Sequence, residues 1–277
     1  MKTALNLRFS ITLMNEPPFK ADTTDSRFSL TPFLAALQFL TVMPPLIKRP
    51  FTAQELGRSV GYYPLVGLLV GAVLAGANWL LGLIFPDTMR AALLLTVWVL
   101  LIGALHLDGF LDACDGLFGG WTPEKRLEIM RDHHIGAFAL AGGVLLLLTK
   151  FTAITAVSSP TTALILAPVL GRWGISIALV RYPYARAQGL GRDMKDQAGK
   201  WELMVATGTA VLIALLLNGL TGFIALFIVS ITANSLAAFV MRRIPGLTGD
   251  IYGAICEISE LAVLLFFVLE AIIVWGS

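Results

Sequence analysis

Residues 91–120 read AALLLTVWVLLIGALHLDGFLDACDGLFGG, an apolar run that passes directly into a stretch with three aspartates. The apolar part, residues 91–107, approaches the length of a membrane-spanning helix, which needs about 20 apolar residues. Asp108, Asp112 and Asp115 follow at spacings of i, i+4 and i+7, which place them on one helix face within about 60° of arc. The stretch predicts a transmembrane helix that ends in a stripe of carboxylates.

The aspartate stripe is expected to bind metal. Three negative charges this close to a low-dielectric membrane repel one another unless a positive charge neutralises them. Mg²⁺ takes oxygen ligands and is often shared between a few carboxylates and substrate phosphates. We therefore expect Asp108, Asp112 and Asp115 to bind Mg²⁺ and to support phosphate chemistry at a membrane face. The alternative is a solvated acidic loop, which the helical spacing and the flanking glycines disfavour.

The composition indicates an integral membrane protein. The chain is 57% hydrophobic and 14% charged, with a mean hydropathy of +0.80, whereas soluble domains are about 25% charged. Its 277 residues allow six to eight spans and leave no room for a separate large soluble domain. The two cysteines are too few for a disulfide framework. The net charge of +2 says little about partners, and we expect the lipid bilayer but no nucleic acid among them.

The chain is expected to fold as an all-α, polytopic transmembrane helix bundle with about seven spans. The predicted spans are Gly61–Phe85, Ala91–Leu107, Ile135–Val157, Thr161–Val180, Leu203–Leu220, Gly222–Met241 and Ile255–Trp275. Gly61, Gly67, Gly71 and Gly76, several at small-xxx-small spacing, suggest close helix packing.

The N-terminal part of the chain is not expected to span the membrane. Thr31–Ile47 is apolar but short and bracketed by prolines, so we expect an interfacial or re-entrant helix there. Residues 1–30 are polar and mixed in charge and are expected to form a flexible extension. Residues 31–277 would then form a single integral membrane domain.

The charged connections predict the orientation in the membrane. The connections after residues 47, 107, 180 and 241 are long and should share one face of the bundle. They hold thirteen basic residues, and the short connections hold only Arg90. By the positive-inside rule the long connections face the cytoplasm. We therefore expect a multi-pass protein of the bacterial cytoplasmic (inner) membrane with its active site facing the cytoplasm and its C-terminus on the opposite side.

A second charged stretch follows the aspartate stripe. Glu128 and Asp132 are four residues apart and share a helix face, with Arg131 beside them. His134 adds a group that titrates near neutral pH. Such residues serve phosphoryl transfer when they surround a phosphate. The alternatives are surface ion pairs for the carboxylates and a solvated histidine.

Further candidates lie at other predicted span ends. Asp250 and Glu257 are seven residues apart where the last apolar span begins, and an acid inside a membrane is a functional candidate by default. A structural hydrogen bond is the alternative for Glu257. Arg186 lies in a basic connection, and His106 lies just before the aspartate stripe, where it either supports the stripe or caps the helix. Arg172, inside an apolar segment, would bind substrate or backbone carbonyls.

The chain resembles the cobalamin synthase family, also called the adenosylcobinamide-GDP ribazoletransferases. The matching motifs are His106-Leu107-Asp108-Gly109, Asp112, Asp115-Gly116, Leu127–Asp132, Ile135-Gly136, Tyr184-Ala185-Arg186, Gly189-Leu190-Gly191 and Thr248-Gly249-Asp250 with Glu257. The resemblance covers about residues 33–277. His133 departs from the serine that is usual in this family, and the first 30 residues look like an addition.

The resemblance implies a reaction and a set of roles. A hydroxyl of α-ribazole, or of its 5′-phosphate, would attack the cobinamide-linked phosphorus of adenosylcobinamide-GDP and release GMP. One or two Mg²⁺ ions would lie on the aspartate stripe. Arg131 and Arg186 would hold phosphate oxygens, and Asp132, Glu257 or a metal-bound hydroxide would take the proton. His106, Glu128, His134 and Asp250 would contact substrate. Oligomerisation and association with other cobalamin-synthesis enzymes stay open.

Two other functions remain open. CDP-alcohol phosphotransferases and prenyltransferases also use closely spaced aspartates and Mg²⁺ on a diphosphate. The Ala-Arg that follows the first Asp-Gly in the CDP-alcohol enzymes is absent after Asp115-Gly116, where Leu117-Phe118 stands. A divalent-cation transporter would place its acids near the bilayer midplane in two related halves, and the sequence shows no internal repeat.

Overall fold

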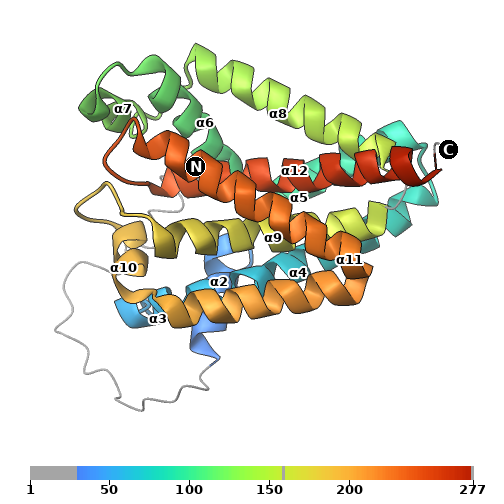
Figure 1. The fold of residues 1–277 in the computed structure, drawn as a ribbon, viewed down its shortest axis with the longest axis horizontal. Coiled ribbons are helices and arrows are strands. Elements are labelled where there is room, and N and C mark those ends of the chain that lie inside the picture. Colours follow the sequence, from blue (N-terminus) through green and yellow to red (C-terminus); the bar gives the residue numbers. More distant parts are fainter. Residues whose placement is uncertain (1–29, 158–159, 276–277) are drawn as a thin grey trace.

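The structure is a computed structural model that describes residues 30–157 and 160–275. Within this part the secondary structure is helical, apart from one isolated β-bridge. The helices are α2 (Thr31–Leu40), α3 (Ala53–Ser59), the 3₁₀ helix η1 (Val60–Tyr62), α4 (Tyr63–Gly82), α5 (Asp87–Leu101), α6 (Leu105–Gly119), α7 (Pro123–Ile129), α8 (Ala137–Ala156), α9 (Pro160–Arg181), α10 (Leu190–Gln197), α11 (Lys200–Met241) and α12 (Gly249–Trp275). The predicted all-α bundle is confirmed (Figure 1). The predicted extension over residues 1–30 lies outside the described residues, apart from Leu30.

Long apolar helices make this a multi-pass membrane protein. Five helices of the described part are long and apolar enough to cross a membrane, and α5 with α6 would make a sixth span. The 42-residue α11 reverses direction at Asn218 and Gly219, where the backbone leaves the helical region, and its two arms run antiparallel (Figure 1). Because Gly219 has a φ of +49°, the reversal uses a conformation that glycine adopts readily. The total of seven spans stays a prediction.

The predicted span over Ala91–Leu107 is wrong as one continuous helix. The helix α5 ends at Leu101, and α6 begins at Leu105 after a bend of 89°. Gly103 and Ala104 have φ values of +58° and +53°, and left-handed residues cannot continue a right-handed helix. The 15 residues of α5 are about 22 Å long, which is shorter than the apolar core of a bilayer. The carboxylate stripe therefore lies on a separate helix that starts inside the bundle.

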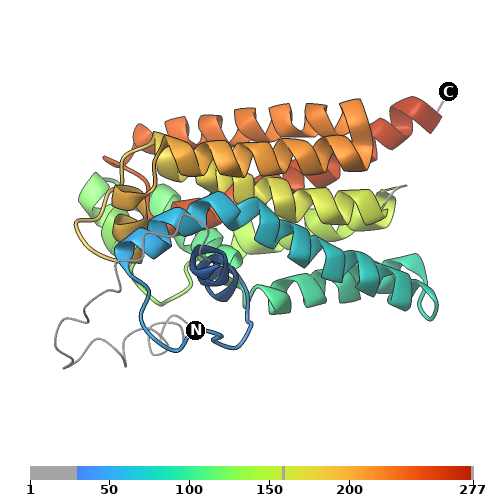
Figure 2. The same ribbon diagram turned by 90° about the horizontal axis from the view of Figure 1, so that it is seen from below.

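The short helix α2 does not run with the spans. It has ten residues, it lies across the long axis of the bundle in Figure 1, and it is seen nearly end-on in Figure 2. The helix ends at Leu40 rather than Ile47, because Thr41 is extended and prolines follow. The side-chain amide of Gln38 donates to the Ile47 carbonyl and accepts from the Ile47 N–H. The structure agrees with the expected non-spanning helix.

The helix α9 is the centre of the bundle, because 89% of its most apolar 18-residue stretch is buried inside the protein. It packs against α4 through glycines. A Cβ atom at Gly67 would lie 2.5 Å from the Pro168 carbonyl oxygen, and one at Gly71 would lie 2.6 Å from the Ile165 Cα. The suggested close packing is confirmed at these two positions. The suggestion is wrong at Gly76, because no atom of a neighbouring element lies within 4 Å of a Cβ placed there.

The long and short connections lie at opposite ends of the bundle. The helices α3, α7 and α10, which belong to the long connections, gather at one end, and the α4–α5 turn, the α11 reversal and the end of α12 lie at the other (Figure 1). The expectation that the long connections share one face is confirmed. Which end faces the cytoplasm stays a prediction, because the structure contains no membrane.

Candidate active site

Two glycines bring α6 and α12 into backbone contact. A Cβ atom at Gly253 would lie 2.8 Å from the His106 carbonyl oxygen, and one at Gly109 would lie 3.0 Å from the Asp250 carbonyl oxygen. No side chain fits at either position without moving a helix backbone. The crossing therefore brings the start of α6, with Asp108, next to the start of α12, with Asp250.

A cavity of about 290 Å³ lies at this crossing. Its walls come from α2, α4, α6, α9, α10, α12 and the segment 184–191. Gly103, at the break between α5 and α6, is part of the wall, and irregular backbone at membrane depth is tolerated where it lines a cavity. Polar residues of the wall include His106, Asp108, Tyr184, Arg186, Gln188, Asp250 and Tyr252. Residues distant in the sequence therefore meet in one site, as predicted for Arg186 and Asp250.

Arg186 and Asp250 form an ion pair in the cavity wall. Arg186 Nη2 lies 2.6 Å from Asp250 Oδ2, and the Thr248 hydroxyl donates to the same oxygen at 3.2 Å. Backbone hydrogen bonds and the β-bridge between Tyr184 and Leu247 hold the segment beside the start of α12. Charge-assisted hydrogen bonds of this kind are strong and directional. They position the Arg186 guanidinium at the cavity.

Tyr184 and Tyr252 form an aromatic wall next to this ion pair. Their rings are stacked, with centroids 6.1 Å apart and planes at 28°. Burial raises the pKa of the Tyr184 hydroxyl above its ordinary value of 10.0, and the positive charges of Arg186 and Arg131 oppose this rise. Tyr184 is therefore protonated at neutral pH. Arg131 is exposed and does not line the cavity, so its predicted role in holding phosphate stays a prediction.

The three aspartates share the helix α6, as predicted, but differ in surroundings. Asp108 lines the cavity, whereas Asp112 lies one turn further along and does not. Asp115 is buried, and its two carboxylate oxygens accept hydrogen bonds from the Gly136 and Ala139 N–H groups at 2.6 and 2.9 Å. Because these N–H groups belong to the start of α8, Asp115 caps that helix. Binding of a metal by the stripe stays a prediction.

A buried ionic cluster lies among α8, α9 and α12. Lys150 Nζ contacts carboxylate oxygens of both Glu257 and Glu260, and Arg172 Nη1 lies 2.9 Å from Glu260 Oε1. The four side chains are at most 4% exposed, and their two positive and two negative charges balance. Glu257, which was expected to be a candidate base, does not line the cavity. Its pairing with Lys150 agrees with the structural alternative, and its catalytic role stays a prediction that this pairing counts against.

Sequence reasoning missed Lys150. The signal was a lone lysine within the otherwise apolar helix α8, because a charge within a span normally has a partner or a function. Arg172 was expected to bind substrate or backbone carbonyls. It does donate to the Pro168 carbonyl oxygen at 3.1 Å, but it also pairs with Glu260.

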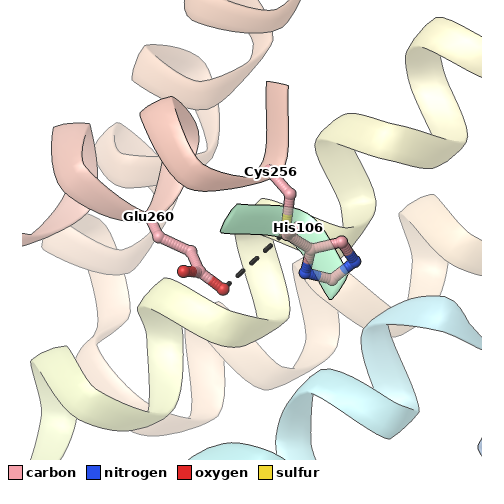
Figure 3. Close-up of side chains that lie close together, drawn as sticks. All are labelled: His106, Cys256 and Glu260. Carbon is pink, nitrogen blue, oxygen red and sulfur yellow. Dashed lines mark hydrogen bonds between the residues drawn. The ribbon is translucent and has the colours of Figure 1, made fainter. Parts of the chain in front are cut away.

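His106, Cys256 and Glu260 come together next to the ionic cluster (Figure 3). Their ligand atoms lie within 4.8 Å of one another, and in the described part of the chain no other set of three such residues is this close. The Cys256 thiol donates to Glu260 at 3.7 Å. Because Glu260 is already paired with Lys150 and Arg172, a cation here would meet two positive charges. The group is therefore a poor cation site.

The second charged stretch lies on the surface and does not line the cavity. Glu128 pairs with Lys125 at 2.9 Å, and both side chains are exposed. His134 Nδ1 lies 2.6 Å from Asp132 Oδ1, and this hydrogen bond lowers the pKa of the Asp132 carboxyl below its ordinary value of 3.8. None of these residues lines the cavity. Glu128 thus forms a surface ion pair, which was the alternative to a role in the site. The predicted roles of Glu128, Asp132 and His134 require a substrate that extends beyond the cavity.

Comparisons with known proteins agree with the resemblance seen in the sequence. A family model described as Cobalamin-5-phosphate synthase matches residues 32–268. A relative from Pseudomonas fluorescens named Adenosylcobinamide-GDP ribazoletransferase is 43% identical over 242 residues, which cover 85% of this chain and 98% of the relative. Relatives of the same name from Roseiflexus sp. and Desulfitobacterium hafniense are 38% and 41% identical, cover 87% and 83% of this chain, and are covered over 90% and 93% of their own length. No solved structure matches. The chain belongs to the cobalamin-5-phosphate synthase family.

Proposed function

We propose that the protein transfers the cobinamide phosphate of adenosylcobinamide-GDP to a ribose hydroxyl of α-ribazole or its 5′-phosphate. The products are adenosylcobalamin or its 5′-phosphate and GMP, in a late step of cobalamin biosynthesis. Family membership and the name of the relatives support this reaction. The structural observation that carries it is the cavity in which Asp108, Arg186 and Asp250 meet.

The reaction exchanges one phosphorus–oxygen bond for another. The ribose oxygen bonds to the cobinamide-linked phosphorus, the bond from that phosphorus to the GMP oxygen breaks, and the hydroxyl proton goes to a base. Arg186 suits the phosphate oxygens, because its side chain lines the cavity and its Nε atom has no hydrogen-bond partner among the described residues. A guanidinium in this position stabilises the negative charge that develops on the phosphoryl oxygens. Arg131 would reach the part of the diphosphate outside the cavity.

Asp108 and Asp112 fit a Mg²⁺ ion by their chemistry. They offer only oxygen atoms, they are one helical turn apart on α6, and Mg²⁺ needs only one or two carboxylates besides water and phosphate oxygens. When bound, the ion would neutralise charge on the diphosphate. Asp115 would be a positioning residue in this scheme, since both its oxygens already accept hydrogen bonds from α8.

Asp250 is the best-placed proton acceptor. Glu257 is buried, paired with Lys150 and absent from the cavity wall, and Asp132 is on the surface. Asp250 lines the cavity and is not among the carboxylates assigned to the metal. Its ion pair with Arg186 would bring the attacking hydroxyl and the phosphate to adjacent groups, which is what an in-line displacement requires.

The orientation follows from the charges at the two ends of the bundle. The end with α3, α7 and α10 carries the basic connections, so in our proposal it faces the cytoplasm, and the other end faces away from it. The membrane is the bacterial inner membrane. Both substrates would then reach the cavity from the cytoplasm.

The test is turnover by the purified full-length protein in lipid vesicles. With adenosylcobinamide-GDP, α-ribazole and Mg²⁺, the protein should release GMP and form a cobalamin, and Asp250→Asn should reduce both products equally. Asp193→Asn, at an exposed position on α10, is the matched control. Turnover of a CDP-alcohol or prenyl diphosphate pair, with none of adenosylcobinamide-GDP, would overturn the proposal in favour of a different membrane transferase.

A further inference from the structure

The cavity has one apolar side and one polar side. The apolar side is formed by α2, α4, α9 and α10, which contribute Phe39, Leu40, Tyr63, Ile175, Leu179 and Met194. These residues belong to one packed hydrophobic cluster. The opposite side carries Asp108, Arg186 and Asp250 from α6, the 184–191 segment and α12. A ligand that fills the cavity must therefore be apolar at one end and polar at the other.

One hydroxyl group in the wall of this cavity has no partner in the described part of the chain. Tyr252 is 6% exposed, and its buried hydroxyl lacks a hydrogen-bond partner among the residues that the structure describes. By contrast, the hydroxyl of Tyr63 lies 3.3 Å from the sulfur of Met194. Because burial of an unpaired hydroxyl is unfavourable, the Tyr252 hydroxyl is a donor that a ligand can satisfy.

We propose that the apolar side binds the base of the acceptor nucleoside, with the Tyr252 hydroxyl donating to its unsubstituted ring nitrogen. This inference rests on the function proposed above. The base of α-ribazole, 5,6-dimethylbenzimidazole, is flat, carries two methyl groups and has one free acceptor nitrogen and no donor. Its needs match an apolar slot with a spare hydroxyl donor in the wall.

The other parts of the two substrates fit this side of the cavity poorly. Guanine has several donors and acceptors on its edges, and most of them would be buried unpaired against the aliphatic and aromatic wall. A corrin ring with its side chains is far larger than about 290 Å³, a volume at the small end of the range for ligand pockets. The donor must therefore lie largely outside, with its diphosphate at the mouth.

This placement also orients the ribose. With the base against α9 and α10, the sugar lies towards Arg186 and Asp250, which belong to the polar side. The attacking hydroxyl then faces the group proposed to accept its proton. Base recognition and phosphoryl transfer would thus use opposite walls of one cavity.

The experiment measures the two substrates separately in the full-length protein. Tyr252→Phe should raise the KM for α-ribazole about tenfold, the effect of one lost hydrogen bond, and change the KM for adenosylcobinamide-GDP less than about twofold. The matched control is Tyr182→Phe, because the Tyr182 hydroxyl contacts Asn234 and not the cavity. This control should keep both KM values.

A substrate analogue completes the test as a double-mutant cycle. In the α-riboside of 5,6-dimethylindole, a C–H group replaces the acceptor nitrogen. The wild-type protein should use it with a kcat/KM about tenfold below that of α-ribazole, and Tyr252→Phe should use the two equally. The wild-type comparison needs no variant, so it tests for a donor at the ring nitrogen even if Tyr252→Phe does not fold, and Tyr252→Phe assigns that donor.

The outcomes separate this inference from the proposed function. Failure of the wild-type protein to make a cobalamin would overturn the function itself. Normal turnover with no discrimination against the indole riboside would overturn only the base site. The base site would also be overturned if Tyr252→Phe raised the KM for adenosylcobinamide-GDP and left the KM for α-ribazole unchanged.

Discussion

Lys150 of α8 and Glu260 of α12 form an ion pair of 2.6 Å inside the bundle, where their side chains are 3% and 0% exposed. The same ammonium group contacts Glu257, and Glu260 also pairs with Arg172. Three helices are thus joined by charges that balance within the cluster. The energetic value of such a cluster lies less in its net contribution than in the cost of removing one member.

Removal of the Lys150 charge should therefore destabilise the protein strongly. Lys150→Met leaves Glu257 buried without its partner, and the loss of stability should be about 3–5 kcal/mol. Thermal unfolding in detergent measures it, with Lys200→Met at the exposed start of α11 as the control. Wild-type stability of Lys150→Met would contradict the ionic cluster.

The double variant Lys150→Met/Glu257→Gln tests the catalytic role of Glu257. The remaining charges of Glu260 and Arg172 balance, so much of the stability should return. We expect turnover to return with it, because Glu257 does not line the cavity. A double variant that folds but is inactive would instead support Glu257 as the proton acceptor.

Substitution of Asp112 should affect turnover, whereas substitution of Asp115 should affect stability. Asp112→Asn should reduce turnover by about 10²-fold or more, through lost metal positioning. Asp115→Ala should destabilise the protein by about 0.5–2 kcal/mol, the usual value of a helix cap, and leave the Mg²⁺ concentration at half-maximal activity unchanged. EDTA should abolish turnover. Near wild-type rates in Asp112→Asn/Asp115→Asn would refute the metal site.

Arg186 should matter for the phosphate-bearing substrate. Arg186→Met removes the guanidinium donors from the cavity and leaves Asp250 without its ion-pair partner, so kcat/KM for adenosylcobinamide-GDP should fall about 10²–10³-fold. The control is Arg192→Met on α10, whose ion pair with Asp196 is largely solvent-exposed. Equal losses in the two variants would show that surface charge, and not the cavity, controls the rate.

The pH profile can exclude Asp132 as the base. The hydrogen bond from His134 lowers the pKa of the Asp132 carboxyl below 3.8, so its ionised form persists as the pH falls and is lost only below that value. If Asp132 takes the proton, kcat/KM should stay constant down to at least pH 5, and His134→Ala should move the acid limb upward. An acid limb centred above pH 5 that His134→Ala does not move would assign the base elsewhere.

Cysteine labelling tests the orientation, and the structure selects the positions. Gly120 and Gly246 lie in the long connections but are buried, so the exposed Trp121 and Gln188 are better sites. In a background without Cys114 and Cys256, cysteines at these two positions should resist an impermeant thiol reagent in intact cells. A cysteine at Asp87 should react. The reverse pattern would invert the topology.

The pattern of apolar segments and charged connections predicted most of the fold. The long apolar helices other than the one expected over Ala91–Leu107, the non-spanning α2 and the shared end of the long connections follow from length, hydrophobicity and basic residues. The break at Gly103 and Ala104 could not be predicted, because both residues are also common within membrane helices. It depends on tertiary packing: Leu101 at the end of α5 accepts a hydrogen bond from Val42 in the segment after α2.

The candidate site was predictable in part. The motifs around Asp108, Arg186 and Asp250 identified residues that do meet in one cavity. Sequence spacing could not show that Asp115 caps α8, since its partners are backbone N–H groups 21 and 24 residues away. Nor could it show the partner of Glu257, because ion pairs between distant helices leave no local pattern.

The ionic cluster also sets an order for insertion into the membrane. Lys150 and Arg172 enter the bilayer with α8 and α9, whereas Glu257 and Glu260 arrive only with α12. Until then two positive charges lie in apolar segments, and insertion experiments put the cost of a lysine or arginine at a helix centre at about 2.5–3.5 kcal/mol. A nascent chain stopped before α12 would therefore retain uncompensated charge and a site for quality-control proteases. Synthesis of the last helix makes the interior electrically neutral, and completion of the chain thereby becomes a condition for its stable residence in the membrane.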